Sequence, residues 1–184
     1  MGEIDLDFVR KQFPAFSNPS LKKKFFFENA GGSYICQQTI ERFSDFLEQR
    51  KFQPNHFFQA SIDASLEIKT ATKRFARYLN VNEDEVLFGP STSQNTYVLS
   101  VALENNLKAG DVIIVSEQEH EANSGVWRKL QKTKAEIKIW PVDRTSGRLE
   151  ITRLEPLLDK KLKMIAMTHC SNLVGEVNNV CEVA

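Results

Sequence analysis

Three consecutive hydroxyl side chains stand where a short apolar run meets a helical pattern. Residues 85–88 form the apolar run, a Gly-Pro pair makes a sharp turn, and Ser91, Thr92 and Ser93 follow it. The first N–H groups of a helix have no intrahelical partner, and the helix dipole makes that end partly positive. Small hydroxyl residues there let a phosphate approach and add donors of their own. The same pattern fits a simple helix cap made by Ser91 or Thr92, and this stretch alone leaves both interpretations open.

Two further polar clusters follow apolar runs later in the chain. Residues 111–115 form a continuous apolar run that leads to His120, and residues 163–169 lead to Asn172. Ligands of open parallel sheets bind at the carboxyl ends of strands, so these clusters are candidate site residues. Taken alone, His120 also fits a capping or surface histidine, Asn172 a turn residue, and His169 a structural hydrogen bond.

The elements that must position these clusters alternate between strand and helix from residue 85 onward. Strands are predicted at residues 85–88, 111–115, 137–142 and 163–169, and helices at residues 4–13, 34–51, 61–79, 92–105, 124–132 and 151–159. This order predicts an α/β fold with a mainly parallel sheet and helices on both faces. Residues 25–27, three phenylalanines, are expected to form a short buried strand or an extended segment.

The composition narrows the class of protein. The chain has 184 residues, 41% of them hydrophobic and 26% charged, and a formal net charge of zero. Such values are typical of a soluble globular protein, and no global field attracts nucleic acid or a membrane surface. The three cysteines, Cys36, Cys170 and Cys181, lack metal-ligand spacing and cannot all pair, so we expect reduced thiols, a cytoplasmic protein and no metal. No apolar stretch resembles a signal peptide or is long enough to cross a bilayer.

Four motifs in register resemble those of the class V aminotransferase-fold enzymes that use pyridoxal 5'-phosphate, with the cysteine desulfurases as the nearest named branch. The resemblance runs from about Phe25 to the end of the chain. The motifs are Phe27-Glu28-Asn29-Ala30-Gly31-Gly32, Ser91-Thr92-Ser93, Glu119-His120-Glu121-Ala122-Asn123 and Thr168-His169-Cys170-Ser171-Asn172-Leu173-Val174-Gly175.

The resemblance implies a role for each motif. Ser91, Thr92 and Ser93 correspond to the family's phosphate loop, His120 to the histidine that stacks on the cofactor ring, and Asn172 to the asparagine that hydrogen-bonds the phenolic oxygen. The substrate lies near the segment that carries Asn29, Ala30 and Gly31. The residues that match these positions are therefore Ser91, Thr92, Ser93, His120 and Asn172 for the cofactor, and Asn29, Ala30 and Gly31 for the substrate.

The resemblance also implies a domain organisation. Residues 1–24 form an N-terminal helix and linker, and residues 25–184 form the N-terminal part of the large domain of a type I, aspartate aminotransferase-like transferase. Family members act on an amino acid and have their active site at the interface of a homodimer. We therefore expect a homodimer.

The chain ends before the family's chemistry is complete. The aspartate that pairs with the pyridine nitrogen, the Schiff-base lysine and the sulfur-accepting cysteine all come later in the family, so no catalytic residue is assigned and the chain is expected to be inactive alone. Cys36, Cys170 and Cys181 do not match the sulfur acceptor. Glu121 replaces a histidine of the family motif, and residues 28–32 point to a divergent desulfurase-like branch, which leaves the substrate open.

Two alternatives remain at this point. Residues 91–96 also resemble the hydroxyl-rich phosphate loop of flavodoxins, which would make the chain an FMN-binding module, although Gln94 stands where that loop has glycine. The other alternative is a truncated or split protein that is non-catalytic and serves in dimerisation.

Overall fold

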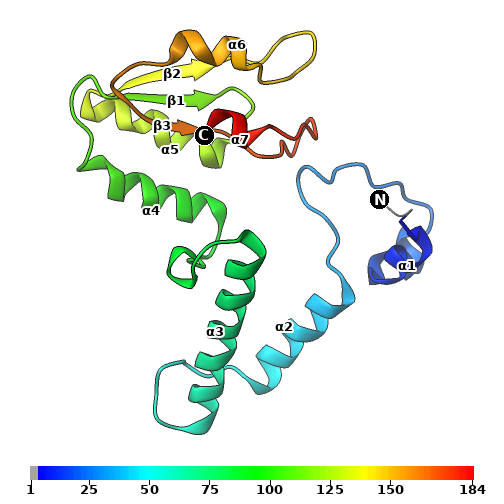
Figure 1. Ribbon diagram of the computed structural model, residues 1–184. Helices are drawn as coiled ribbons and strands as arrows, with labels where there is room; N and C mark the ends of the chain where they lie inside the picture. The colour runs from blue at the N-terminus through cyan, green and yellow to red at the C-terminus, as the bar shows by residue number, and fades with distance from the viewer. Residues whose placement is uncertain (1–3) are drawn as a thin grey trace. The chain divides into compact units, whose positions relative to one another are not determined.

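The computed structural model describes residues 4–184 and divides into two compact units, with the boundary between Leu87 and Phe88. The first unit is helical and contains α1 (Leu6–Lys11), α2 (Gln37–Gln49) and α3 (Gln59–Leu79) (Figure 1). Short 3-10 turns at Pro14–Ser17, Pro19–Leu21 and Glu83–Glu85 complete it. The helices expected at residues 4–13, 34–51 and 61–79 are thus confirmed, with shifted ends.

Charged side chains join α2 to α3 in the first unit. Arg42 and Arg50 both pair with Glu67, and Arg50 Nε also lies 2.8 Å from Asp45 Oδ2. The two guanidinium groups that donate to Glu67 hold the pKa of its carboxyl below the usual range. These pairs are half exposed, so they orient the helices more than they stabilise them.

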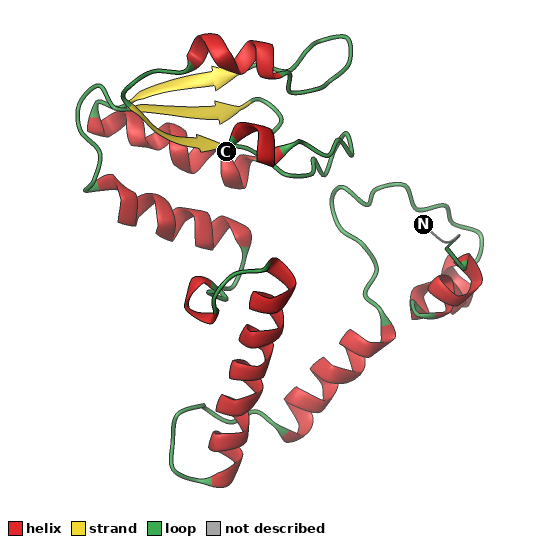
Figure 2. Cartoon of the chain, in the orientation of Figure 1, coloured by secondary structure: helices red, strands yellow, loops and turns green. Residues whose placement is uncertain are grey.

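The second unit is built on a three-stranded parallel sheet (Figure 2). Its strands are β1 (Val112–Ser116), β2 (Glu136–Trp140) and β3 (Leu162–Ala166), in the order β2-β1-β3. Val115 pairs with Ile139 on one side and with Ala166 on the other. Every residue of β1 is buried, which is the reason that its sequence is a continuous apolar run rather than an alternating one.

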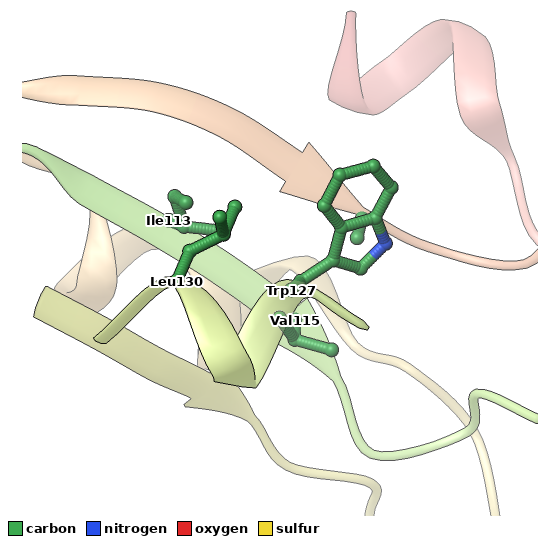
Figure 3. Close-up of a cluster of buried hydrophobic side chains, with 5 residues drawn as sticks. Ile113, Val115, Trp127 and Leu130 are labelled. Atoms are coloured by element: carbon green, nitrogen blue, oxygen red, sulfur yellow. The ribbon is translucent and has the colours of Figure 1, made fainter. Parts of the chain in front are cut away.

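Helices cover both faces of this sheet, as the sequence predicted. One face buries the cluster Ile113, Val115, Trp127, Leu130 and Ala166, and Figure 3 shows Trp127 and Leu130 beside Ile113 and Val115. The covering elements on that face are α4 (Thr92–Glu104), α5 (Gly125–Arg128) and the 3-10 turn Lys129–Thr133.

The opposite face buries a second cluster, formed by Val112, Ile114, Trp140 and Leu154. It is covered by α6 (Ile151–Leu154), the 3-10 turn Glu155–Leu157 and α7 (Val180–Val183). The sequence pattern had not predicted α7, which is only one turn long. The side chain of its Val183 packs against this cluster.

Two local predictions need correction. The strand predicted at residues 85–88 is wrong: a 3-10 turn ends at Glu85, and residues 86–89 belong to neither a helix nor a strand. A strand forms only where a neighbour supplies ladder hydrogen bonds, and Leu87 is 88% exposed. Residues 25–27 form no strand and are not buried, since Phe25 is 87% and Phe27 90% exposed.

Within the described part of the chain, no helix combines the length and the apolar character needed to cross a membrane.

The burial of β1 predicts a position-dependent cost of removing one methyl group. Ile114 is fully buried and Ile139, on the paired strand β2, is 45% exposed. Ile114→Val should lower the free energy of unfolding by about 0.5–1.5 kcal/mol. Ile139→Val, the matched control, should change it by less than about 0.5 kcal/mol. Urea unfolding followed by fluorescence of Trp127 and Trp140 measures both, and equal effects would contradict the burial of β1.

Candidate functional site

The N-terminus of α4 carries the three hydroxyl residues. Ser91 is the N-cap, and its Oγ accepts a hydrogen bond from the Gln94 backbone N–H at 3.2 Å. The capping interpretation therefore holds for Ser91. Thr92 and Ser93 form the first turn and are exposed. A helix of 13 residues presents the partial positive charge of its first N–H groups at this end, beside both hydroxyls.

Gly89, just before this helix, lies close to a side chain of the helix. A Cβ atom at residue 89 would collide with Oδ1 of Asn95, one turn into α4. The absence of a side chain thus lets the incoming segment lie against the first turn of the helix.

A chain of polar side chains fixes the segment that follows β1. The carboxylate of Glu119 accepts from Ser116 Oγ at 3.0 Å and from Asn123 Nδ2 at 2.7 Å. Asn123 Oδ1 in turn accepts from the indole N–H of Trp127 at 2.9 Å. Trp127 belongs to the core, so this series of hydrogen-bonded side chains anchors the segment that contains His120 to the packed sheet.

His120 caps a 3-10 turn and remains exposed. Its Nδ1 accepts from the backbone N–H of Ala122 at 3.1 Å, which assigns the proton of the neutral ring to Nε2. The carbonyl of Ala122 accepts from Thr96 Oγ1 of α4 at 2.6 Å. The capping interpretation therefore also holds for His120, and the capping bond occupies one edge of the imidazole ring. The Thr96 bond brings the first part of α4 next to the segment that carries His120.

Asn172 lies in a closed loop that follows β3. The loop is held by backbone bonds from Ser171 N to Glu176 O and from Gly175 N to Ser171 O, both 2.9 Å, and by an isolated bridge between Cys170 and Val177. Gly175 has a φ of +69°, which favours glycine at that turn. Asn172 is exposed in this loop. His169, also exposed, accepts at its backbone carbonyl from Asn178 N at 2.8 Å.

Two residues of this edge were missed by sequence reasoning. Asn178 is 7% exposed, and its Nδ2 donates to Gln118 Oε1 at 2.9 Å and to Thr168 O at 2.8 Å. Gln118 Nε2 donates to Gly147 O at 2.7 Å. An asparagine and a glutamine in polar loops carry no periodic signal, and only the fold shows that residues 60 positions apart are paired.

Asp143 orders the turn after β2, at the same edge of the sheet. Hydrogen bonds from the backbone and hydroxyl of Ser146 and from the backbone N–H of Thr145 hold the pKa of the Asp143 carboxyl below its usual value, with a smaller contribution from Arg153. Arg153 Nη2 lies 2.7 Å from the second carboxylate oxygen. Gly147, the partner of Gln118, belongs to this turn and has a φ of +72°.

The predicted site residues therefore fall into two groups. Ser91, Thr92, Ser93, His120 and Asn172 all belong to the second unit, at the N-terminus of α4 and after β1 and β3. Asn29, Ala30 and Gly31 belong to the first unit, where Ser33 Oγ donates to Asn29 Oδ1 at 3.4 Å. The substrate role of these three residues stays a prediction.

Comparison with known proteins gives concordant matches. The profile described as Aminotransferase class-V matches residues 25–184. An aminotransferase-like protein of Gibberella zeae, FGM3, is 32% identical over 100% of this chain and 46% of its own length. A cysteine desulfurase of Serratia proteamaculans is 27% identical over 95% of this chain and 44% of its own length. The chain thus spans less than half the length of these curated relatives.

Solved structures share the fold. The apo structure of a cysteine desulfurase from Thermococcus onnurineus has a TM-score of 0.82 at 22% identity, over 96% of this chain and 43% of that chain. A mutant enzyme with glycine covalently linked to its pyridoxal phosphate has a TM-score of 0.64 at 17% identity, over 85% of this chain and 39% of that chain.

The hydrogen bonds of Asp143 predict a pH dependence of stability. The pKa of this carboxyl is lower in the folded chain than the value of about 3.9 in an unfolded one. Its stabilisation is therefore complete above the unfolded pKa and is lost as the pH falls through the folded pKa. Asp143→Asn should weaken the fall in unfolding free energy below about pH 4.

Urea unfolding at several pH values, read by tryptophan fluorescence, measures this slope. Ser146→Ala, which removes only one of the hydrogen bonds to the carboxylate, should have a smaller effect in the same direction. An identical slope in the parent chain and in Asp143→Asn would show that this carboxyl does not contribute.

Proposed function

The chain belongs to the class V aminotransferase family, and we propose that it supplies the phosphate- and ring-binding part of a pyridoxal phosphate enzyme, cysteine desulfurase-like, that acts on an amino acid. One observation carries the proposal. The hydrogen bond between Thr96 and the carbonyl of Ala122 brings the N-terminal part of α4 beside the segment of His120. A phosphate site and a flat ring are thus neighbours at the carboxyl edge of the sheet.

The residues at the start of α4 fit a phosphate monoester. Thr92 and Ser93 offer exposed hydroxyl donors, and the first N–H groups of the helix add backbone donors. Ser91 is engaged with Gln94 N, so its contribution is to start the helix and to orient the two following residues.

His120 and Asn172 fit the ring of the cofactor. His120 has an exposed imidazole whose orientation is fixed by the bond from Ala122 N, so a face of the ring can stack on a flat partner. Asn172 carries an amide that can donate to a phenolic oxygen from the loop after β3. When bound, pyridoxal phosphate supplies an electron sink for the negative charge that develops at the Cα of an amino acid.

Three further proposals concern the whole protein. Asn29, Ala30 and Gly31 contact the amino-acid substrate. A homodimer covers part of the apolar surface that each unit leaves exposed, which includes Leu87 in the first unit and Leu173 in the second. A cytoplasmic location fits the three unpaired thiols. Neither catalytic lysine nor sulfur-accepting cysteine is assigned in this chain.

The family membership favours this cofactor over the flavodoxin-like alternative. The hydroxyl-rich segment 91–96 fits a phosphate of either cofactor, whereas the segments around His120 and Asn172 resemble aminotransferase motifs and lie within the matched residues 25–184. Comparing the affinities of the same purified chain for FMN and for pyridoxal phosphate therefore distinguishes the two alternatives.

The proposal predicts different effects at the two ends of the site. The double variant Thr92→Val with Ser93→Ala should weaken both pyridoxal phosphate and inorganic phosphate about tenfold, because hydrogen bonds to a charged group are lost. His120→Ala should weaken the binding of pyridoxal phosphate by a similar factor. It should leave the affinity for inorganic phosphate unchanged, because in the proposed site the imidazole stacks on the cofactor ring and does not contact the phosphate. Absorbance titration and calorimetry measure the two affinities.

Thr145→Val is the matched control, since Thr145 is an exposed threonine whose backbone, not its hydroxyl, is bonded to Asp143. It should leave both affinities unchanged. Binding of FMN in preference to pyridoxal phosphate, or equal loss of both ligands in His120→Ala, would overturn the assignment.

A further inference from the structure

A pair of amides, one buried (Asn178) and one half-buried (Gln118), links the segments that carry His120 and Asn172. We propose that Gln118 and Asn178 form a positioning pair, which holds the loop of Asn172 at a fixed place relative to His120. The inference rests on the proposed function, in which His120 and Asn172 bind the same ligand. Neither Gln118 nor Asn178 is expected to touch the ligand.

Asn178 donates hydrogen bonds to two different segments. One hydrogen of its Nδ2 goes to Gln118 Oε1, two residues before His120, and the other fits Thr168 O, at the start of the loop after β3. Its backbone N–H goes to His169 O. The side chain is 7% exposed, so water cannot replace these bonds without opening the edge.

Gln118 extends the connection to the third strand end. Its Nε2 donates to Gly147 O in the turn that Asp143 orders after β2. The pair thus connects the segments that follow β1, β2 and β3. Backbone ladders fix the strands themselves, but they end at Ser116, Trp140 and Ala166. Beyond those residues, the side chains of Gln118 and Asn178 help to join the loops, as do the bond from Val142 N to Glu117 and the Arg148–Glu176 ion pair.

We expect the loop of Asn172 to shift as one body if this pair is lost. Its internal bonds, Ser171 N to Glu176 O and Gly175 N to Ser171 O, involve neither Gln118 nor Asn178. Removing the side-chain amide of Asn178 therefore removes the bond between the base of this loop and the segment of Gln118, and leaves the loop itself closed by its backbone bonds. The predicted consequence is a change in the spacing of Asn172 and His120, without a change at the N-terminus of α4.

That consequence separates positioning from general stabilisation. Inorganic phosphate reports on Thr92 and Ser93 alone, whereas pyridoxal phosphate also needs His120 and Asn172. Asn178→Ala, and the equally sized Asn178→Asp that cannot donate, should weaken pyridoxal phosphate roughly fivefold or more while leaving phosphate affinity unchanged. Asn179→Ala, a change at the neighbouring exposed asparagine, should affect neither ligand.

A second control removes stability without touching the pair. Ile114→Val lowers the free energy of unfolding but changes no residue of the pair or of the proposed site. It should therefore leave both affinities, expressed per folded molecule, unchanged. If Asn178→Ala and Asn178→Asp bind pyridoxal phosphate as tightly as the parent chain, the positioning role is wrong. Equal loss of both ligands would also overturn it, because the effect would then be a general loss of structure.

Hydrogen exchange of the ligand-free chain tests the pair independently of the proposed function. In Asn178→Ala, the amide of residue 178 should exchange at least tenfold faster, while those of Ser171 and Gly175 stay protected. Loss of protection throughout the loop would overturn the inference. If the parent chain binds no pyridoxal phosphate, the proposed function fails, and this exchange pattern still decides whether the pair holds the base of the loop.

Discussion

The burial of β1 between two apolar layers is the constraint on which the rest of the second unit depends. All five of its residues are buried, and strands pair with it in parallel on both sides. A parallel strand that is buried on both faces needs helices above and below, and these supply Trp127 to one layer and Leu154 to the other. Because the three strands run in one direction, the segments that follow them meet at one edge, and that edge holds the candidate site.

Polar groups at this edge are satisfied by one another rather than by the core. Ser116 donates to Glu119, and Asn178 donates to Gln118 and Thr168, so buried polar atoms keep hydrogen bonds. Among residues 4–184, no buried side-chain nitrogen or oxygen lacks a partner. Unpaired polar atoms in a low-dielectric interior are costly, so these bonds are a condition of folding. The bonds of Glu119 and Gln118 also hold the segment that carries His120, so one network serves stability and positions a residue of the proposed site.

The sequence predicted the elements whose signal is local. The strands at residues 111–115, 137–142 and 163–169 were found because each is an apolar run between polar segments, and the family match confirms the fold that they imply. The strand at residues 85–88 was predicted from the same kind of run and is absent, because strand formation also needs a neighbour that the run does not specify. The pairing of Gln118 with Asn178 could not be predicted, since it depends on how two distant loops meet.

Helix capping and the proposed ligand binding are compatible uses of one residue. Ser91 accepts from Gln94 N and His120 accepts from Ala122 N, which are the local roles that each residue type would have in any protein. These bonds occupy one acceptor of each side chain and fix its direction. A ligand gains from that fixed direction, because the entropy of ordering the side chain has already been lost during folding. The capping bonds therefore support the proposed cofactor site at the N-terminus of α4 and at His120 instead of competing with it.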